Sequence, residues 1–249
     1  MPEPLLDPAL LDEFPIGRLL AERDRLGRFM LGYQSGIEEV STKLRILEQE
    51  FQHMHEYNPI EHVASRLKKP ESVLQKAKRI GCPSELEAMR EQITDIAGVR
   101  VVCSFVRDVY EVAEMLCGQP DVRVLKRKDY IAAPKDNGYR SLHVIVEVPI
   151  FFSREQLLVP VEVQFRTIAM DFWASLEHKI YYKYDREVPA ELLDGLHDAA
   201  ETAARLDADM ERLHVQVHGE FPGTTPEAAP TQSLAGDRTV RVRNTVHNP

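Results

Sequence analysis

Residues 141–148 read SLHVIVEV and residues 159–166 read VPVEVQFR, and these two stretches decide the fold. In both stretches polar and apolar side chains alternate with the period of two that is typical of a β-strand with one face on a core. The first stretch places His143 opposite a row of aliphatic side chains, and the second places Glu162 and Gln164 opposite valines. The pattern predicts two strands of one sheet that share a polar face.

Other segments extend this sheet and surround it with helices. Apolar, β-branched runs predict further strands at 96–105 and 122–131, with a helix at about 109–117 between them. A helix is expected from Pro70 to Ile80, because proline suits the first turn and Gly81 suits the stop. Apolar residues at heptad spacing predict long helices over about 26–54 and 192–217. The fold class is therefore α+β, with a mixed β-sheet of about five strands flanked by helices.

Composition sets the class of protein. The chain has 249 residues, of which 43% are hydrophobic and 29% charged, as in a soluble globular protein with a real core. The formal net charge of −9 argues against nucleic-acid binding over the whole surface. The three cysteines of the chain show no CxxC spacing, so we expect neither a disulfide framework nor a zinc site. We therefore expect a cytoplasmic location.

The ends of the chain differ from its middle. No apolar run approaches the roughly 20 residues that span a bilayer, so we expect no membrane segment. Residues 1–14 are proline-rich and are interpreted as a flexible leader. Residues 219–249 lack periodicity and are interpreted as a disordered tail. One domain with flanking helices is expected over 15–218.

Positive charge gathers in two islands. Residues 66–79 hold six Lys and Arg residues against one acid, and residues 123–128 hold four. In the expected helix at 70–80, Ser72, Lys76 and Arg79 share one face, a combination that suits a polyphosphate. An ordinary amphipathic surface helix would have the same pattern.

Further polar residues could form a pocket on the sheet. Arg100 interrupts an apolar strand and would share the polar face with His143, Glu162 and Gln164. Asp95 comes just before that strand, where it could be a salt-bridge partner, a turn residue or a metal ligand. With Glu162 it would offer the oxygen ligands that Mg²⁺ accepts beside substrate phosphates. A solvent-exposed sheet face is the alternative.

The loop before residue 141 adds groups suited to a nucleotide. It carries Lys135, Asn137, Tyr139 and Arg140 around an Asn-Gly turn. A tyrosine beside cations can stack on a base while the cations hold phosphate, although a loop tyrosine can also simply cover the core.

Several blocks in order resemble one known family. They are SRLKKPESVLQKAKR (65–79), ITDIAGVRVV (93–102), KDYIAAPKDNGYRSLHV (128–144) and VEVQFRTIAMDFWASLEHKIYYKY (161–184). Together they resemble the synthetase domain of the RelA/SpoT family, and specifically its stand-alone small alarmone synthetases, over roughly 57–184. The resemblance implies a nucleotidyltransferase-like synthetase fold. It also implies a GTP/GDP pyrophosphokinase, which moves the β,γ-pyrophosphate of ATP to the ribose 3′-hydroxyl of GDP or GTP, with GMP as a further acceptor, giving (p)ppGpp and AMP.

The same resemblance implies a role for each matching residue. Asp95 and Glu162 would be catalytic and would bind Mg²⁺, with Mn²⁺ as an alternative, and Glu162 would also accept the proton of the 3′-hydroxyl. ATP would be bound by Arg66, Lys68, Ser72, Lys76, Arg79 and Arg100. GDP or GTP would be bound by Lys128, Lys135, Asn137, Tyr139, His143, Gln164 and Asp171, with Tyr139 stacked on guanine.

The chain departs from the family pattern at two positions, and it differs in length from the long members of the family. Asp171 stands where asparagine is expected, and Lys126 stands where the family often has arginine. The chain is too short for the hydrolase and regulatory domains of long members, and the His197-Asp198 pair lacks the rest of a hydrolase site, so we expect no hydrolase activity.

Assembly and activity leave alternatives open. The family's small members commonly form homotetramers through flanking helices, whereas both heptad seams here could instead pack on their own sheet. Two other functions remain open: a toxin-like relative that pyrophosphorylates the tRNA 3′ end, and a noncatalytic nucleotide-binding regulator.

Overall fold

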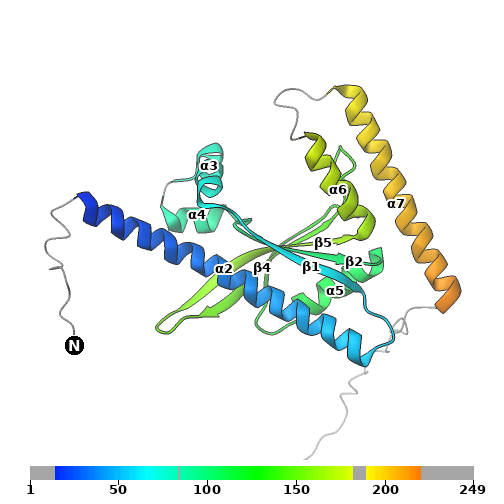
Figure 1. Cartoon of the computed structure of the whole chain (residues 1–249), viewed down its shortest axis with the longest axis horizontal. Coiled ribbons are helices and arrows are strands. Elements are labelled where there is room, and N and C mark those ends of the chain that lie inside the picture. The colour runs from blue at the N-terminus through cyan, green and yellow to red at the C-terminus, as the bar shows by residue number, and fades with distance from the viewer. Residues whose placement is uncertain (1–14, 84, 182–188, 220–249) are drawn as a thin grey trace, which may run out of the picture.

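The computed structural model describes residues 15–83, 85–181 and 189–219, and in them a five-stranded sheet organises the chain (Figure 1). The strand order is β1-β2-β5-β4-β3. The elements, in chain order, are α2 (Pro15–Met54), β1 (Ile60–Leu67), α3 (Pro70–Ile80), α4 (Leu86–Gln92), β2 (Ala97–Cys103), α5 (Val106–Cys117), β3 (Arg123–Asp129), β4 (Leu142–Phe151), β5 (Gln156–Thr167), α6 (Ile168–Tyr181) and α7 (Ala190–His218). The expected leader at 1–14 and residues 220–249 of the expected tail lie outside the described residues.

The sheet is mixed, as expected from the sequence. β5 pairs parallel with β2 and antiparallel with β4, and the outer strands β1 and β3 add antiparallel pairs. Both strands quoted at the start of the sequence analysis lie next to each other, with His143 opposite Gln164. The α+β class and the mixed sheet of about five strands are confirmed.

One strand was not expected from the sequence. β1 reads IEHVASRL, and its burial does not alternate cleanly. Its register against β2 also shifts between Ile60 and His62. A strand at the edge of a sheet is held by main-chain hydrogen bonds to one neighbour, so it needs less apolar patterning than a central strand.

Helix α2 runs across the sheet, as Figure 1 shows. Its Tyr33, Ile37, Val40 and Leu44 are buried in the core. A side chain at Gly36 would bring a Cβ within 2.8 Å of Cγ1 of Val159, so glycine lets the helix approach β5 this closely. The first heptad seam therefore packs on its own sheet.

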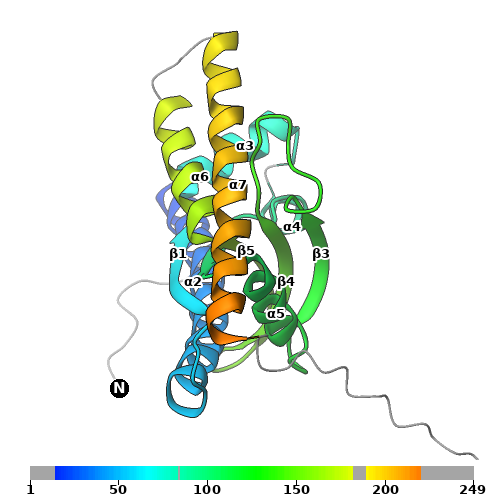
Figure 2. The same ribbon diagram turned by 90° about the vertical axis from the view of Figure 1, so that its right-hand side faces the viewer.

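Helices α6 and α7 lie side by side at one end of the sheet (Figure 2). Trp173 and Ala174 of α6 pack against Leu196 and Ala200 of α7, and the indole nitrogen of Trp173 donates to the carbonyl of Leu196 at 2.9 Å. The C-terminal half of α7 leaves several apolar side chains of the second seam exposed, namely Leu206, Met210, Leu213 and Val217. In the described part of the chain, the helices are too short or too polar to cross a bilayer.

Candidate active site

A cavity of about 720 Å³ lies over the polar face of the sheet. Strands β1, β2 and β5, the loop before β2 and helix α6 all contribute to its wall. Its lining includes six residues expected in the site from the sequence, which are Arg66, Lys68, Asp95, Arg100, Glu162 and Gln164. Both carboxylates predicted to act together therefore face the same space.

Strand register explains how the polar floor forms. Gln164 of β5 is the Cα partner of Arg100 on β2 and of His143 on β4. Partners across a sheet point to the same face, so these three side chains form a row. In the next row Glu162 lies beside Gly98, whose missing side chain leaves open space next to the carboxylate. The predicted polar face of the sheet is confirmed.

The other carboxylate, Asp95, is held by two lysines. Nζ of Lys68 lies 2.7 Å from Oδ2 of Asp95, and Nζ of Lys76 lies 2.6 Å from Oδ1. Burial would raise the pKa of Asp95, but the hydrogen bonds and charges of the lysines outweigh burial and hold the pKa below its ordinary value. The sequence left three roles open for Asp95, and in the described structure it is a salt-bridge partner.

Helix α3 carries Lys76 to this position. Its Val73 and Ala77 are buried, and Gly81 ends it in the left-handed conformation with φ of 70°. Ile80, which shares the spacing of the buried residues, is instead 45% exposed because the helix ends there. Ser72 and Arg79 share the face of Lys76 by spacing, and none of these three predicted residues lines the cavity.

Two arginines on adjacent strands line the cavity. Arg66 of β1 is the Cα partner of Gly98, and Arg100 of β2 is the partner of Ala64. They are thus diagonal neighbours on adjacent strands, and each faces a position with little or no side chain. Guanidinium planes stack on aromatic rings, so this pair of arginines, each opposite a small residue, suits a purine.

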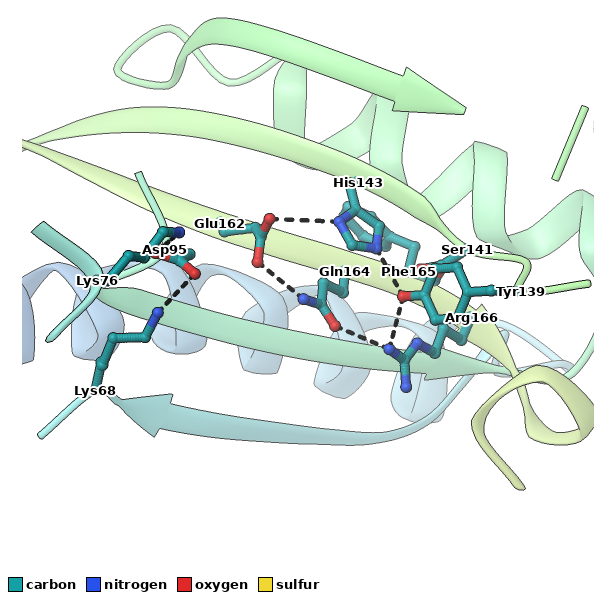
Figure 3. A network of polar contacts seen from close by, with 10 residues as sticks. All are labelled: Lys68, Lys76, Asp95, Tyr139, Ser141, His143, Glu162, Gln164, Phe165 and Arg166. Carbon is teal, nitrogen blue, oxygen red and sulfur yellow. Dashed lines mark hydrogen bonds and ion pairs between the residues drawn. The ribbon is translucent and has the colours of Figure 1, made fainter. Parts of the chain in front are cut away.

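The loop that leads into β4 meets Glu162 from the other side. The hydroxyl of Tyr139 lies 2.8 Å from Nε2 of His143, and Nδ1 of His143 lies 3.3 Å from Oε1 of Glu162 (Figure 3). Gln164 donates to Oε2 of Glu162 at 2.8 Å. Burial would raise the pKa of Glu162, but the hydrogen bonds from His143 and Gln164 lower it below its ordinary value.

The remaining loop residues surround Tyr139. Nζ of Lys135 lies 4.6 Å from the centre of the Tyr139 ring, a cation–π distance. Asn137 accepts a hydrogen bond from the main-chain nitrogen of Tyr139 at 3.2 Å. Lys128 is the Cα partner of His143 on β3. These residues gather at the edge of the floor, outside the lining of the main cavity.

Arg166 is a member of this cluster that sequence reasoning did not select. It is 7% exposed, and its Nη2 donates to the hydroxyl of Tyr139 at 2.8 Å and to Oε1 of Gln164 at 3.1 Å. The available signal was its spacing, because Arg166 follows Glu162 and Gln164 at steps of two on the same face.

Asp171 lies between two arginines. Its Oδ1 is 3.1 Å from Nη1 of Arg100 and 3.0 Å from Nη1 of Arg166. The resemblance placed Asp171 among the residues that bind the acceptor. In the structure its contacts are with the arginine expected to stack on adenine and with the network below Tyr139.

The carboxylates of the cavity are the groups that could bind the expected metal ion. Asp95 and Glu162 line one cavity, and the charge of Asp95 acts on the pKa of Glu162. Among the described residues no cluster of three or more potential metal ligands occurs. Two carboxylates fit Mg²⁺, which is usually bound by one or two carboxylates together with substrate phosphates.

These features define a class of protein. The polar face of this mixed sheet combines carboxylates with many cations, and two arginines of adjacent strands line the cavity above it. Such a site is that of a nucleotide-dependent phosphoryl-type transferase. A family profile described as a region found in RelA / SpoT proteins matches residues 65–187. Curated relatives include the GTP pyrophosphokinase YwaC of Bacillus subtilis strain 168, 50% identical over 188 residues that cover 76% of this chain and 90% of the relative. The GTP pyrophosphokinase YjbM of the same strain is 39% identical over 191 residues that cover 76% of this chain and 89% of YjbM.

Solved structures agree with these relatives. Small alarmone synthetase 1 from Bacillus subtilis, bound to its product pppGpp, has a TM-score of 0.72 at 38% identity and covers 78% of this chain and 98% of its own. Small alarmone synthetase 2 from Bacillus subtilis has a TM-score of 0.70 at 46% identity, with 77% and 98% covered. The chain belongs to the RelA/SpoT family, as the sequence blocks indicated, and its fold is that of the small alarmone synthetases.

Proposed function

We propose that this protein is a (p)ppGpp synthetase, a GTP/GDP pyrophosphokinase that forms the alarmone and AMP. It transfers the β,γ-pyrophosphate of ATP to the ribose 3′-hydroxyl of GDP or GTP, or of GMP. One observation carries the proposal: Asp95 and Glu162 face one cavity that is also lined by Arg66, Lys68 and Arg100. The relatives named GTP pyrophosphokinase support the same activity.

The ATP side lies between β1, β2 and α3. Arg66 and Arg100 stack on the two faces of adenine. The cations of the β1–α3 segment hold the triphosphate, and they are Lys68, Lys76 and Arg79, with Ser72 as a hydroxyl donor. Lysine acts there as a point charge and arginine as a planar fork, so negative charge on the phosphate oxygens is balanced from several directions.

The acceptor side lies along β4 and the loop before it. Tyr139 stacks on guanine, and Lys128, Lys135, Asn137, His143 and Gln164 contact the nucleotide and its phosphates. The close approach of Lys135 to the Tyr139 ring supports this proposal, because it brings a cation and an aromatic ring together in one loop. Asp171 acts on this side only indirectly, through Arg166, and it acts on the ATP side through Arg100, since its described contacts are with these two arginines.

Catalysis is attack of the 3′-oxygen on the β-phosphorus. Glu162 accepts the proton of the hydroxyl, and its lowered pKa keeps it in the ionised form that can act as acceptor. Asp95 and Glu162 would hold Mg²⁺, with Mn²⁺ as an alternative, whose charge would neutralise the polyphosphate oxygens. Positioning and electrostatic stabilisation supply most of the rate, as in other transfers of this type.

We further propose a cytoplasmic homotetramer without hydrolase activity. Exposed apolar residues on the C-terminal half of α7, at steps of four, three and four, support association of copies, and they are Leu206, Met210, Leu213 and Val217. Multi-angle light scattering after gel filtration would measure the mass of the assembly. Incubation of labelled ppGpp with the protein would detect hydrolysis.

A transfer assay separates the proposed function from its alternatives. The protein is incubated with γ-labelled ATP, Mg²⁺ and either GMP, GDP, GTP or deacylated tRNA, and the products are resolved. Label on a guanosine nucleotide supports the synthetase. Label on tRNA would establish the toxin-like activity, and no transfer to any acceptor would leave the noncatalytic regulator. The net charge of −9 and the presence of Tyr139 favour the nucleotide over tRNA.

A further inference from the structure

Five side chains below the acceptor loop form a closed ring of hydrogen bonds (Figure 3). Arg166 contacts Tyr139 and Gln164, Tyr139 contacts His143, and both His143 and Gln164 contact Glu162. Two arms therefore run from one arginine to the two oxygens of one carboxylate. Such a ring differs from a set of independent contacts, because each member limits the proton positions of the next.

Proton directions along the first arm follow from chemistry. An ionised carboxylate can only accept, so Nδ1 of His143 carries the proton that it donates to Oε1 of Glu162. In this tautomer Nε2 accepts, and the Tyr139 hydroxyl donates to it. Arginine can only donate, so the Tyr139 oxygen accepts from Arg166, which leaves its own proton directed at Nε2.

The second arm gives the same result. Arg166 donates to Oε1 of Gln164, which turns the amide NH₂ of Gln164 toward Oε2 of Glu162. A carboxylate has about four lone-pair positions, of which these arms occupy two. The others remain for the cavity that Glu162 lines. The ring thus holds both oxygens as acceptors and fixes the orientation of the group.

We infer that Arg166 is a positioning residue for pyrophosphate transfer: through the Tyr139 hydroxyl it supports the Nδ1–H tautomer of His143, it orients the amide of Gln164, and through both it holds the orientation of Glu162. The inference rests on the proposed function, in which Glu162 accepts the proton of the 3′-hydroxyl. Arg166 lines the cavity, but it is only 7% exposed, and its hydrogen bonds go to the side chains of Asp171, Tyr139 and Gln164.

The same arginine also connects this ring to the ATP side. Oδ1 of Asp171 lies between Arg166 and Arg100, at 3.0 Å and 3.1 Å. The side chain expected to stack on adenine and the group expected to accept the proton are thus linked through Asp171 and Arg166. A planar arginine satisfies this geometry because its Nη1 and Nη2 donate in different directions, which a lysine ammonium does not reproduce.

The test combines rates with a direct view of the ring. Arg166→Met removes all donors, and Tyr139→Phe breaks only the first arm while Arg166 and Asp171 stay in place. We expect both variants to lower kcat by about 10²-fold, with smaller changes in the KM for ATP. The double variant should lose little more than the larger single loss, because Arg166→Met already breaks the arm that Tyr139→Phe breaks. Arg123→Met, which removes a cross-strand ion pair with Glu147 on the same sheet, is the matched control and should leave kcat unchanged.

Nitrogen-15 NMR reads the tautomer in the protein without nucleotides, with a His143→Gln spectrum to identify the signals. The wild-type protein should show Nδ1 protonated, and Arg166→Met and Tyr139→Phe should shift both ring nitrogens toward a mixture. An unchanged tautomer in both variants, or an unchanged kcat in the folded Tyr139→Phe protein, would overturn the inference. Absence of transfer by the wild-type chain would instead remove the proposed function, while the NMR result would still decide the hydrogen-bond directions.

Discussion

Nζ of Lys76 lies 2.6 Å from Oδ1 of Asp95, so a proposed metal ligand forms an ion pair with a proposed phosphate-binding cation. Lys68 holds the other oxygen of the same carboxylate. A nucleotide with its metal offers phosphate oxygens to the lysines and a cation to Asp95. Binding therefore exchanges one set of charge pairs for another, and no buried charge is left without a partner.

Loss of the Asp95 carboxylate should weaken the binding of Mg²⁺ at the site. We expect Asp95→Asn to lower kcat/KM by about 10²–10³-fold, since metal stabilisation of the transferred group amounts to several kcal/mol. Initial rates over a range of Mg²⁺ concentrations measure the effect, and a chelator should abolish wild-type transfer. Asp121→Asn is the control. Asp121 also pairs with a lysine, Lys43, at 2.6 Å, but it does not line the cavity. Equal losses in both variants would contradict a metal-binding function for Asp95.

The contacts of Asp171 predict an effect on the KM for ATP. Removing its charge leaves Arg100 and Arg166 without the carboxylate between them. We expect Asp171→Asn to raise the KM for ATP about tenfold, which corresponds to about 1.4 kcal/mol. Steady-state kinetics with each substrate varied in turn measure this. A change confined to the KM for the guanosine nucleotide would show that Asp171 contacts the acceptor directly.

The acceptor loop depends on a glycine that touches α7. A Cβ on Gly138 would lie 2.5 Å from Cβ of Ala200, and Gly138 has φ of +83°. We expect Gly138→Ala to lower the free energy of unfolding by about 1–3 kcal/mol and to raise the KM for the guanosine nucleotide more than that for ATP. Kinetics and denaturant unfolding measure both effects.

Gly195 in α7 provides the comparison for this glycine. A Cβ there meets nothing within 4 Å, so Gly195→Ala should stabilise the helix by about 0.5–1 kcal/mol without changing either KM. If Gly138→Ala behaved like Gly195→Ala, contact between the loop and α7 would not support the acceptor side.

Asp207 makes stability depend on pH. Burial raises the pKa of this carboxyl from 3.8 to about 6, with the Thr167 hydroxyl and Arg140 opposing the rise and Glu211 adding to it. The folded chain therefore binds the proton more tightly than the unfolded chain. The free energy of unfolding falls as pH rises from about 3.8 to about 6, and the loss persists above that range.

A neutral residue at this position should remove the loss. Asp207→Asn can still accept the Thr167 hydroxyl bond, which is 2.7 Å in the wild-type protein. We expect it to raise the free energy of unfolding by about 2 kcal/mol at pH 8 and by less at pH 5. Urea unfolding at the two pH values checks this, and equal destabilisation at both would refute it.

Much of this site follows from sequence, because strand alternation fixes faces. The period of two in residues 141–148 and 159–166 placed His143, Glu162 and Gln164 on one polar face, where the structure has them. Contacts between distant segments are not encoded in this way. The pairing of Asp95 with Lys76 depends on how α3 packs, through Val73 and Ala77, and no spacing rule reports it.

Residues that act through others were the hardest to predict. Arg166 ends a polar alternation and looks like one more residue of a solvated face, yet it is buried with three hydrogen-bond partners. Strand β1 was missed because its pairing depends on main-chain bonds with β2 more than on its side chains. Both cases require knowledge of neighbours that only the assembled sheet supplies.

The convergence of two carboxylates on one transfer reaction is tested most directly at Glu162. Transfer of γ-label from ATP to GDP is measured for the wild-type protein, for the nearly isosteric Glu162→Gln, and for Glu147→Gln on the same sheet, outside the cavity lining. We expect wild type and Glu147→Gln to form labelled product and AMP in equal amounts, and Glu162→Gln to remain folded without transfer. Full activity of Glu162→Gln would contradict the assignment of Glu162 as metal ligand and proton acceptor.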